Sequence, residues 1–320
     1  MAFDALVIGA GVAGCATTLE LLSAGWRVAI LHRRDNVSAM ESLSPAAVSD
    51  LNKLSIRNES AFSEIVAWWG SEQEARATQL GAGIVRRSAL ADSLRARAID
   101  GGARVIEIKK VSYIERFSDG WELAYELTPG DQRKLRAGYL IDGTGRASVI
   151  GRHLGARRVV FDQLFCTSVS VNDPGLVGTW TESTADGWWN LCCVQKEGTL
   201  SFYSTAQRLR KSKRDITGCL YETRHMRHLV PAPMRGKCQI RPCGSSRLVP
   251  CAGPGWVSVG DAASTIQPLA SGGVAKALRD ARMARQALEY QAGNYDRTQD
   301  RKSTRLNSSH IQKSRMPSSA

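Results

Sequence analysis

The sequence has no long apolar run and few histidines. The first feature excludes a membrane-spanning helix, and the second leaves few candidate ligands for a metal ion. No stretch of 18 apolar residues occurs in the 320 residues, so the sequence offers no membrane-spanning helix. The N-terminus has no basic segment before an apolar core, and glycines interrupt its apolar run, which argues against a cleaved signal peptide. With 43% hydrophobic and 23% charged residues, we expect a cytoplasmic globular protein of two domains or one large α/β domain.

The eight cysteines show no spacing typical of a metal site. No CxxC pair is present, and no His and Cys cluster has zinc spacing. We therefore expect no bound metal, and eight reduced cysteines that are mostly buried as small apolar side chains.

The last 21 residues contribute four of the thirteen net positive charges. Residues 300–320 contain five Lys or Arg and one Asp, and removing them lowers the net charge to +9. This segment resembles the translation of a sequencing adapter, so we expect it to be disordered and the natural C-terminus to be missing; the alternative is a natural basic tail. The remaining charge suits an anionic cofactor or partner and is not by itself a nucleic-acid signature.

A glycine-rich turn near the N-terminus has the context of a dinucleotide site. An apolar strand over Ala5–Ile8 runs into Gly9, Gly11 and Gly14, and an apolar-periodic helix follows. Gly9 permits a tight bend, Gly11 lets a pyrophosphate approach the backbone, and Gly14 lets helix and strand pack closely. The free N–H groups of the helix N-terminus would face the phosphate. The spacing therefore predicts a cofactor-binding turn.

The end of the second predicted strand departs from that pattern. An acidic side chain is expected there to hold the adenosine ribose, but the sequence has His32, followed by Arg33 and Arg34. A neutral imidazole can hydrogen-bond a hydroxyl, and either arginine can meet a phosphate instead.

Two further motifs follow later strands. The first ends in Asp142-Gly143, where the carboxylate can accept hydroxyl hydrogen bonds, although such a motif alone is more often only a turn. The second begins with Gly260-Asp261, and a proline and paired glycines then precede a long helix. Asp261 can bind a polyol chain, and the helix N-terminus can stabilise negative charge on a flavin ring.

The periodicity predicts the remaining elements. We expect a helix over residues 42–69 and an amphipathic helix over Ser88–Ile99. Strands are expected within residues 104–142 and 157–206, and residues 207–229 are basic and helix-like.

In their order and separations, these three motifs resemble the FAD-dependent monooxygenase superfamily with the aromatic-hydroxylase fold, over roughly residues 3–290. The resemblance implies an α/β fold, truncated at its C-terminus. A Rossmann-type FAD-binding domain of residues 1–156 and 247–299 would receive an inserted β-sheet substrate domain of residues 157–246.

The resemblance also assigns roles to residues. The first motif would bind the ADP part of FAD, the Asp-Gly motif would lie near the flavin and nicotinamide, and the Gly-Asp motif would hold the ribityl chain. Arg87 matches an arginine that supports the cofactor in this superfamily. The predicted cofactor-binding residues are Gly9, Gly11, Gly14, His32, Arg33, Arg87, Asp142, Gly143, Gly260, Asp261, Pro268, Gly272 and Gly273.

Two segments resemble the tryptophan-halogenase-like branch. They are Glu41–Pro45 and the strands around Asp186–Trp189 and Gly198–Thr205. Halogenases of that branch need a Trp-x-Trp-x-Ile-Pro motif, and Trp188–Cys193 fails at three of its four fixed positions. Their halogenating lysine has no clear counterpart near residues 58–69. The chain therefore looks more like halogenase-related flavoproteins that modify a tryptophan of a partner protein during quinone-cofactor maturation.

Trp188 and Trp189 would point to opposite faces of a strand. We expect one in the core, and the other is a candidate to line the substrate pocket. No side-chain acid or base stands out, so no catalytic residue is predicted.

The resemblance implies an FAD-dependent oxidoreductase, most simply a monooxygenase in which a flavin hydroperoxide transfers oxygen to an electron-rich aromatic. The expected substrate is a small aromatic or a peptide, with an indole or a protein tryptophan as candidates, and NAD(P)H is a candidate reductant. A partner protein is compatible with this interpretation, whereas nucleic acid and membrane are not expected as partners. The alternative is an inactive flavoprotein fragment or a partner-binding scaffold, which the altered His32 position motivates.

Overall fold

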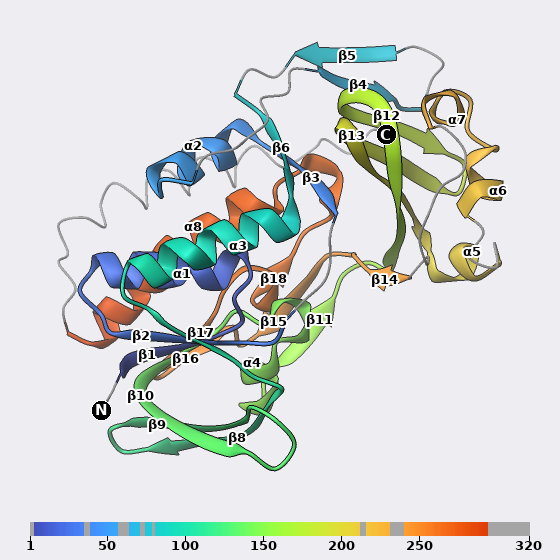
Figure 1. Ribbon diagram of the computed structural model, residues 1–320. Coiled ribbons are helices and arrows are strands. Elements are labelled where there is room, and N and C mark those ends of the chain that lie inside the picture. Colours follow the sequence, from blue (N-terminus) through green and yellow to red (C-terminus); the bar gives the residue numbers. More distant parts are fainter. Residues whose placement is uncertain are drawn as a thin grey trace, which may run out of the picture.

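The computed structural model describes residues 3–293 apart from six gaps. The gaps are residues 35–38, 57–63, 71–73, 79–80, 212–215 and 231–239. The described chain has two parts, one on a largely parallel sheet and one on a largely antiparallel sheet (Figure 1). Residues 300–320, which were predicted to be disordered, lie outside the described residues.

A run of parallel strands forms the centre of the first part. β1 (Phe3–Ile8) lies between β2 (Val28–His32) and β10 (Gln132–Asp142), and β7 (Arg104–Glu107) and β17 (Trp256–Ser258) lie outside them. The last four residues of β1 are buried. Such a strand is covered on both faces, which explains why its sequence is a continuous apolar run.

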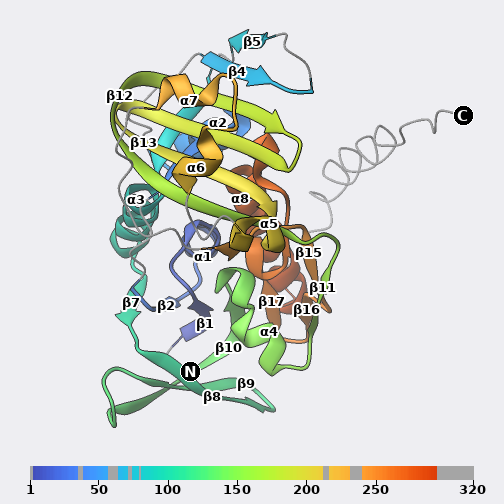
Figure 2. The same cartoon turned by 90° about the vertical axis from the view of Figure 1, so that its right-hand side faces the viewer.

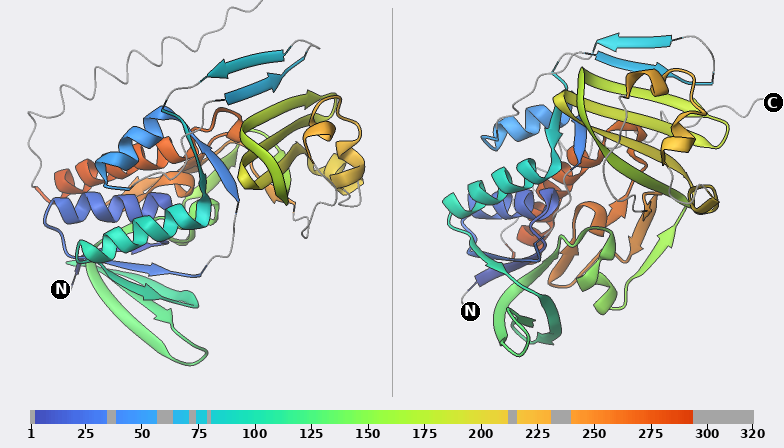
Figure 3. Two further views of the ribbon diagram at one scale, coloured as in Figure 1. Left: turned by 45° about the horizontal axis from the view of Figure 1, so that its top comes forward. Right: turned by 45° about the vertical axis from the view of Figure 1, so that its right-hand side comes forward.

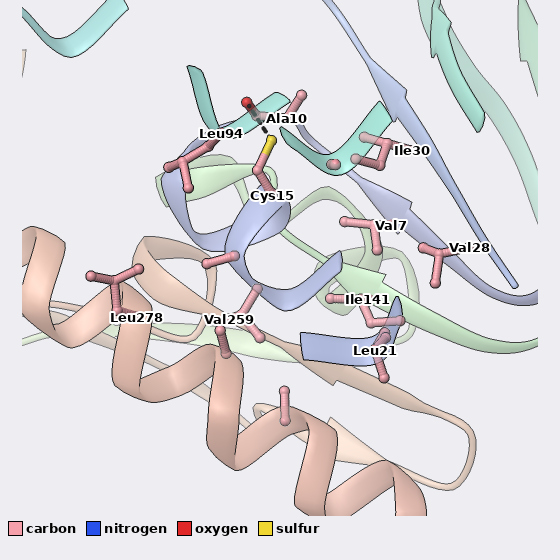
Figure 4. Close-up of a cluster of buried hydrophobic side chains, with 14 of the residues drawn as sticks. Val7, Ala10, Cys15, Leu21, Val28, Ile30, Leu94, Ile141, Val259 and Leu278 are labelled. Carbon is pink, nitrogen blue, oxygen red and sulfur yellow. Dashed lines mark hydrogen bonds between the residues drawn. The ribbon is translucent and has the colours of Figure 1, made fainter. Parts of the chain in front are cut away.

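Three long helices cover one face of these strands. They are α1 (Val12–Ser23), α3 (Arg87–Asp100) and α8 (Gly273–Gln291), and they lie side by side in Figure 1. Their apolar stripes and the sheet enclose the first core. Figure 4 shows Cys15 and Leu21 of α1 among core side chains from the sheet and from α8.

α2 (Pro45–Lys53) begins where the sequence predicted a helix but is much shorter than expected. The backbone N–H of Ala47 donates to Oγ of Ser44 at 3.3 Å, and proline occupies the first helical position. The helix predicted over residues 42–69 is wrong at its start, where residues 42–43 belong to a strand, and at β4 (Glu64–Trp68), which pairs with a distant strand; residues 57–63 lie outside the described residues. The apolar residues of β4 gain that pairing only in the folded chain.

The other face of the parallel strands carries an antiparallel extension. β8 (Lys110–Phe117) and β9 (Gly120–Glu126) form a meander with β10. The chain then turns through η1 (Gly145–Ala147) into the short helix α4 (Val149–His153). These elements enclose a further core around the buried Trp121 and Trp256.

The second part is built on a long hairpin of β12 (Leu164–Thr184) and β13 (Gly187–Thr205). β4 joins β12 in parallel, β5 (Glu74–Thr78) pairs with β4, and β14 (Arg241–Pro242) pairs with the start of β12. β4 and β5 therefore join the sheet of the predicted substrate domain although residues 1–156 were assigned to the FAD-binding domain. The exact division of the chain into domains stays a prediction.

β13 doubles back near Gln195, whose φ is +51°. Its two halves lie side by side, because Trp188 stacks on Tyr203 and Trp189 stacks on Phe202. The two tryptophans therefore lie on opposite faces of the sheet. Three short helices cover the face that carries Trp189, and Figure 2 shows them over β12 and β13. They are α5 (Ala206–Lys211), α6 (Ile216–Leu220) and α7 (Met226–Leu229).

The remaining short strands lie in two small sheets and at the edge of the first sheet, and Figure 3 gives two further views of the whole chain. β3 pairs with β6, β15 pairs with both β11 and β18, and β16 pairs with β17. These strands are β3 (Met40–Leu43), β6 (Gly83–Arg86), β11 (Arg157–Val160), β15 (Ser246–Val249), β16 (Ala252–Gly253) and β18 (Ser264–Thr265). Two short 3-10 helices, η2 (Gly260–Ala262) and η3 (Pro268–Ala270), lie before α8. Among the described residues, no helix combines the length and the hydropathy needed to cross a membrane.

Candidate functional site

Three glycines from two motifs meet where β1 and β10 end. Gly9 has φ of +106°, and a Cβ atom there would overlap the carbonyl oxygen of Gly143. A Cβ on Gly14 would overlap the carbonyl oxygen of Gly9, and one on Gly143 would lie 3.1 Å from Cα of Gly14. The turn after β1, the turn after β10 and the start of α1 therefore touch backbone to backbone, which only glycine permits.

Gly11 differs from its neighbours because space lies beside it. Apart from Gly11 and its chain neighbours, no heavy atom of the described residues comes within 4 Å of the position that a Cβ on Gly11 would take. Gly11 is the N-cap of α1, no side chain caps that end, and the first turn contains no acidic residue. The first amides of α1 therefore remain available to an anion that approaches over Gly11.

His32 is half-buried at the end of β2, as the sequence placed it. Burial lowers the pKa of the imidazole, and the nearby positive charge of Arg95 lowers it further. The side chain is therefore neutral at physiological pH and can both donate and accept a hydrogen bond. Arg33 and Arg34 are exposed beyond it.

Asp142 is fully buried, and its carboxylate already has four protein donors. Oδ1 accepts from the backbone N–H and the hydroxyl of Thr144, at 3.0 and 2.6 Å. Oδ2 accepts from the backbone N–H groups of Ile150 and Gly151, at 3.0 and 2.9 Å. This carboxylate therefore holds the turn between β10 and α4, and a direct contact with a cofactor stays a prediction.

The Gly-Asp motif lies against the first turn of α1. Gly260 has φ of +58°, and a Cβ there would lie 2.5 Å from Cβ of Ala13. A buried ion pair fixes the backbone of Gly260: its N–H donates to Asp280 at 3.1 Å, and its carbonyl accepts from Nζ of Lys276 at 3.0 Å. Lys276 and Asp280 bond to each other at 2.5 Å. The neighbouring carboxylate of Asp261 is exposed and is available to a ligand.

Sequence reasoning missed Lys276 and Asp280, and it also missed Arg158. The guanidinium of Arg158 donates to the carbonyls of Asp261 and Ala262, at 3.0 and 2.8 Å. Burial lowers the pKa of Arg158. The only sequence signal for the ion pair was an i, i+4 spacing on α8, which is equally typical of a solvated helix face.

The Glu41-Ser42 segment reaches the start of α8. The hydroxyls of Ser42 and Ser271 are hydrogen-bonded, and Glu41 pairs with Arg87 at 2.9 Å. α8 has no side-chain cap. Outside its own helix and chain neighbours, no heavy atom in the described part of the chain lies within 4 Å of a Cβ position on Gly273. Pro268 and Gly272 belong to the same turn before α8. The structure therefore gathers this group beside a second uncapped helix N-terminus.

The sheet of the second part presents a polar face on the side of Trp188. Trp188 stacks on Tyr203 with ring centroids 3.7 Å apart, and Oγ1 of Thr199 accepts from the backbone N–H of Met40 in β3 at 2.9 Å. Burial raises the pKa of Tyr203, so its phenol stays protonated. Trp189, 1% exposed, packs in the apolar cluster under the three short helices, and Trp188 is also largely buried, 8% exposed.

Hydroxyl and amide side chains continue this polar face. Oγ of Ser168 and Oγ of Ser201 lie 2.8 Å apart, and Nδ2 of Asn190 donates to Oγ1 of Thr181 at 3.2 Å. The sequence carried a signal for this face, because polar and apolar residues alternate along β12 and β13. Sequence reasoning did not use it.

Two cavities of the described chain lie away from the motif turns. One, of about 410 Å³, is lined by residues that include Trp26, Arg27 and Gly101. A cavity of about 290 Å³ between α1, α2 and α8 is lined by charged residues that include Glu20, Asp50 and Arg282, and no motif residue lines it. Within the described ranges, no group of three or more His, Cys, Asp or Glu side chains could hold a metal ion.

Comparisons with known proteins agree with the fold. The chain matches no protein-family model. It is 26% identical over 311 residues to a protein of Marinomonas mediterranea named as an FAD-dependent oxidoreductase, LodB, and the match covers 89% of this chain and 84% of LodB.

Two solved structures have the same architecture. The myxobacterial chondrochloren halogenase CndH superposes with a TM-score of 0.81 at 20% identity, covering 93% of this chain and 77% of CndH. The peptidyl tryptophan dihydroxylase QhpG superposes with a TM-score of 0.73 at 20% identity, covering 95% of this chain and 69% of QhpG. The chain therefore shares the α/β fold of the FAD-dependent halogenase CndH and of QhpG.

Proposed function

We propose that the chain is an FAD-dependent oxidoreductase that inserts oxygen into an electron-rich aromatic ring, an indole or a tryptophan of a partner protein. The observation that carries this proposal is the meeting of the three motif turns. Gly9, Gly14 and Gly143 are in backbone contact, and Gly260 packs against the same end of α1. Only Gly11 in this group faces open space, as a turn that receives a pyrophosphate requires.

The residues present fit FAD along its length. Gly11 and the first amides of α1 would receive the pyrophosphate, and neutral His32 would bond the adenosine ribose. The exposed carboxylate of Asp261 would accept bonds from ribityl hydroxyls. The uncapped N-terminus of α8 at Gly273 would stabilise negative charge on the flavin ring. Bound FAD would supply the two-electron chemistry and the activation of oxygen.

The protein's own part in the reaction is to position and to shield. Lys276 and Asp280 fix the turn that carries Asp261, and Ser42 bonds the residue before the α8 glycines. No described side chain has the exposure and geometry that would single it out as a catalytic acid or base. Positioning alone supplies a large share of the rate in such enzymes.

The polar face of the second sheet favours an aromatic substrate. Trp188 and the protonated phenol of Tyr203 provide stacking area and one hydrogen-bond donor. The dihydroxylase QhpG is named as acting on peptidyl tryptophan, and this supports a protein-borne substrate for the present chain. NAD(P)H or a separate reductase would provide the electrons.

The test is oxygen transfer. FAD-loaded protein, NADPH or NADH, a flavin reductase and oxygen would be incubated with indole, free tryptophan and tryptophan peptides, and the products would be examined by mass spectrometry with ¹⁸O₂. We expect ¹⁸O in at least one aromatic product. Reduced flavin that is reoxidised with release of hydrogen peroxide, and no labelled product from any of these substrates, would contradict the monooxygenase proposal.

A further inference from the structure

Two cysteines that the proposed reaction does not use lie together at the edge of the second sheet. Cys166 of β12 is paired with Arg241 of β14, and the backbone N–H of Cys243 donates to the carbonyl of Leu164 at 2.9 Å. Alternate residues of a strand share a face, so Cys166 and Cys243 are diagonal neighbours on one face. Each side chain affects the pKa of the other thiol, and both cysteines are free and only partly buried.

The backbone around the pair is held firmly. Asp162 accepts from the N–H of Ser245 at 2.8 Å and from the N–H of Leu164 at 3.2 Å, so it ties the segment after β14 to the start of β12. A Cβ on Gly244 would lie 2.6 Å from the carbonyl oxygen of Asp162, so glycine is required for this approach. The backbone therefore keeps the two cysteines as diagonal neighbours. Diagonal neighbours lie roughly 7–8 Å apart, so a disulfide needs a small shift of β14 as well as rotation of the side chains.

The surroundings make the two thiols unequal. The hydrogen bond from Cys243 lowers the pKa of Cys166, and the charges of Arg241 and Arg146 lower it further against the opposing effect of burial. The same hydrogen bond and burial raise the pKa of Cys243, and Asp162 adds to that rise. Arg146 donates to the carbonyl of Gly244, which keeps its guanidinium beside the pair. A thiolate therefore forms first on Cys166.

We propose that Cys166 and Cys243 are a peroxide-sensitive thiol pair, in which Cys166 attacks and Cys243 resolves. The thiolate of Cys166 attacks hydrogen peroxide, so an S–O bond forms, the O–O bond breaks and hydroxide leaves, which gives a sulfenic acid. The sulfur of Cys243 then displaces that hydroxyl, so an S–S bond forms, the S–O bond breaks and water leaves with the proton of Cys243. Two thiols and one peroxide give one disulfide and two waters, and the peroxide gains two electrons.

The position of the pair links it to the candidate substrate face. Tyr203 is paired directly with Cys166 across β12 and β13, and it stacks on Trp188. A disulfide would join β14 to β12 at this end of the sheet. The inference itself is independent of the proposed function, because the oxidant in its test is added peroxide.

The experiment is disulfide mapping on the full chain. Fully reduced protein receives one equivalent of hydrogen peroxide, free thiols are blocked with iodoacetamide, and the digest is examined by mass spectrometry. We expect a Cys166–Cys243 cross-link as the main oxidised species. Cys251, which is also partly exposed, provides the control: C251S should form the same cross-link. A main cross-link to another cysteine, Cys238 included, or no cross-link at all, would overturn the proposal.

Two further variants test the order of events. C243S should accumulate a sulfenic acid on Cys166 that dimedone traps, and C166S should give several-fold less dimedone product at Cys243. Equal trapping in the two variants would overturn the assignment of the attacking thiol. If either serine variant fails to fold, the rate of iodoacetamide labelling in the wild type decides: Cys166 should react several-fold faster than Cys243 at neutral pH. Equal rates would contradict the assignment.

Discussion

The two parts of the molecule carry their chemistry in different ways. In the parallel part, the predicted site is made of backbone: three glycines touch, a fourth faces open space, and two helix N-termini are uncapped. In the second part, the candidate surface is made of side chains on one face of a folded hairpin. A backbone site depends on glycine at fixed spacing, whereas a side-chain surface depends on which strands pair. The comparison predicts that single substitutions separate cofactor binding from substrate binding.

The largest expected effect concerns the two tryptophans of β13. Trp189 is buried against Phe202, so W189A should lower the free energy of unfolding by about 3–5 kcal/mol, measured by urea titration. W188A is the matched variant: Trp188 is 8% exposed and stacks on the half-buried Tyr203, so it should lose less stability than W189A while it changes KM for the aromatic substrate. Equal losses of stability would remove the distinction between a core face and a substrate face.

A substitution at Gly11 of the glycine turn should weaken FAD binding and leave the stability of the apoprotein unchanged. G11D places a carboxylate where only open space lies, so the folded apoprotein should keep its Tm. The same carboxylate would face the pyrophosphate, and repulsion between charges about 4 Å apart costs about 4 kcal/mol at an effective dielectric of 20. FAD fluorescence titration measures that loss. G14A is the matched control, because its Cβ would overlap Gly9 and lower the Tm of the apoprotein itself.

The buried ion pair tests whether the Gly-Asp turn needs support from α8. K276M would leave the carboxylate of Asp280 without its cation, which costs about 3 kcal/mol of stability in partly buried pairs. FAD affinity should fall as well, because Gly260 loses its restraint. The double variant K276M/D280L should recover part of the stability and none of the affinity. Recovery of both would show that the pair only serves folding.

Asp261 should show the effect of one ligand contact. D261A should weaken FAD binding by about 1.5–3 kcal/mol, the usual loss of a hydrogen bond to a charged acceptor. Its side chain is exposed and has no described hydrogen bond, so the Tm of the apoprotein should stay unchanged. Calorimetric titration and a thermal melt measure the two quantities. An equal loss in apoprotein and FAD-bound protein would assign Asp261 to the turn alone.

The smallest effect concerns pH and His32. The folded-state pKa of His32 is depressed by burial and by Arg95, so the unfolded chain binds a proton more readily. This contribution to stability is present above the unfolded value of about 6.5 and is lost as the pH falls through the folded value. H32Q should therefore lose less stability than the wild type between pH 7 and pH 5. Parallel stability curves would show that His32 does not titrate in this range.

The sequence was most informative where backbone geometry restricts the choice of residue. Gly9, Gly11 and Gly14 predicted the first turn, and the order of the motifs predicted the α/β fold that the chain shares with CndH. Strand alternation predicted that Trp188 and Trp189 point apart, which the stacking partners confirm.

The features that sequence reasoning missed depend on contacts between distant segments. β4 was expected to be helical, because its partner β12 lies about a hundred residues away and no local pattern announces that pairing. The folding-back of β13 and the approach of β14 to Cys166 have the same origin. Asp142 illustrates a different limit. The sequence predicted its position at the end of a strand, but only the structure shows the four hydrogen-bond donors around its carboxylate.

The most direct test of the central claim is titration of folded apoprotein with FAD, followed by flavin fluorescence and the visible absorption of the desalted product. If the three glycine turns form the site, the wild type should retain one FAD per chain and G11D should retain none, although both should melt at the same temperature without FAD. A wild-type protein that is folded but colourless after the titration, or a G11D variant that is fully loaded, would contradict the account.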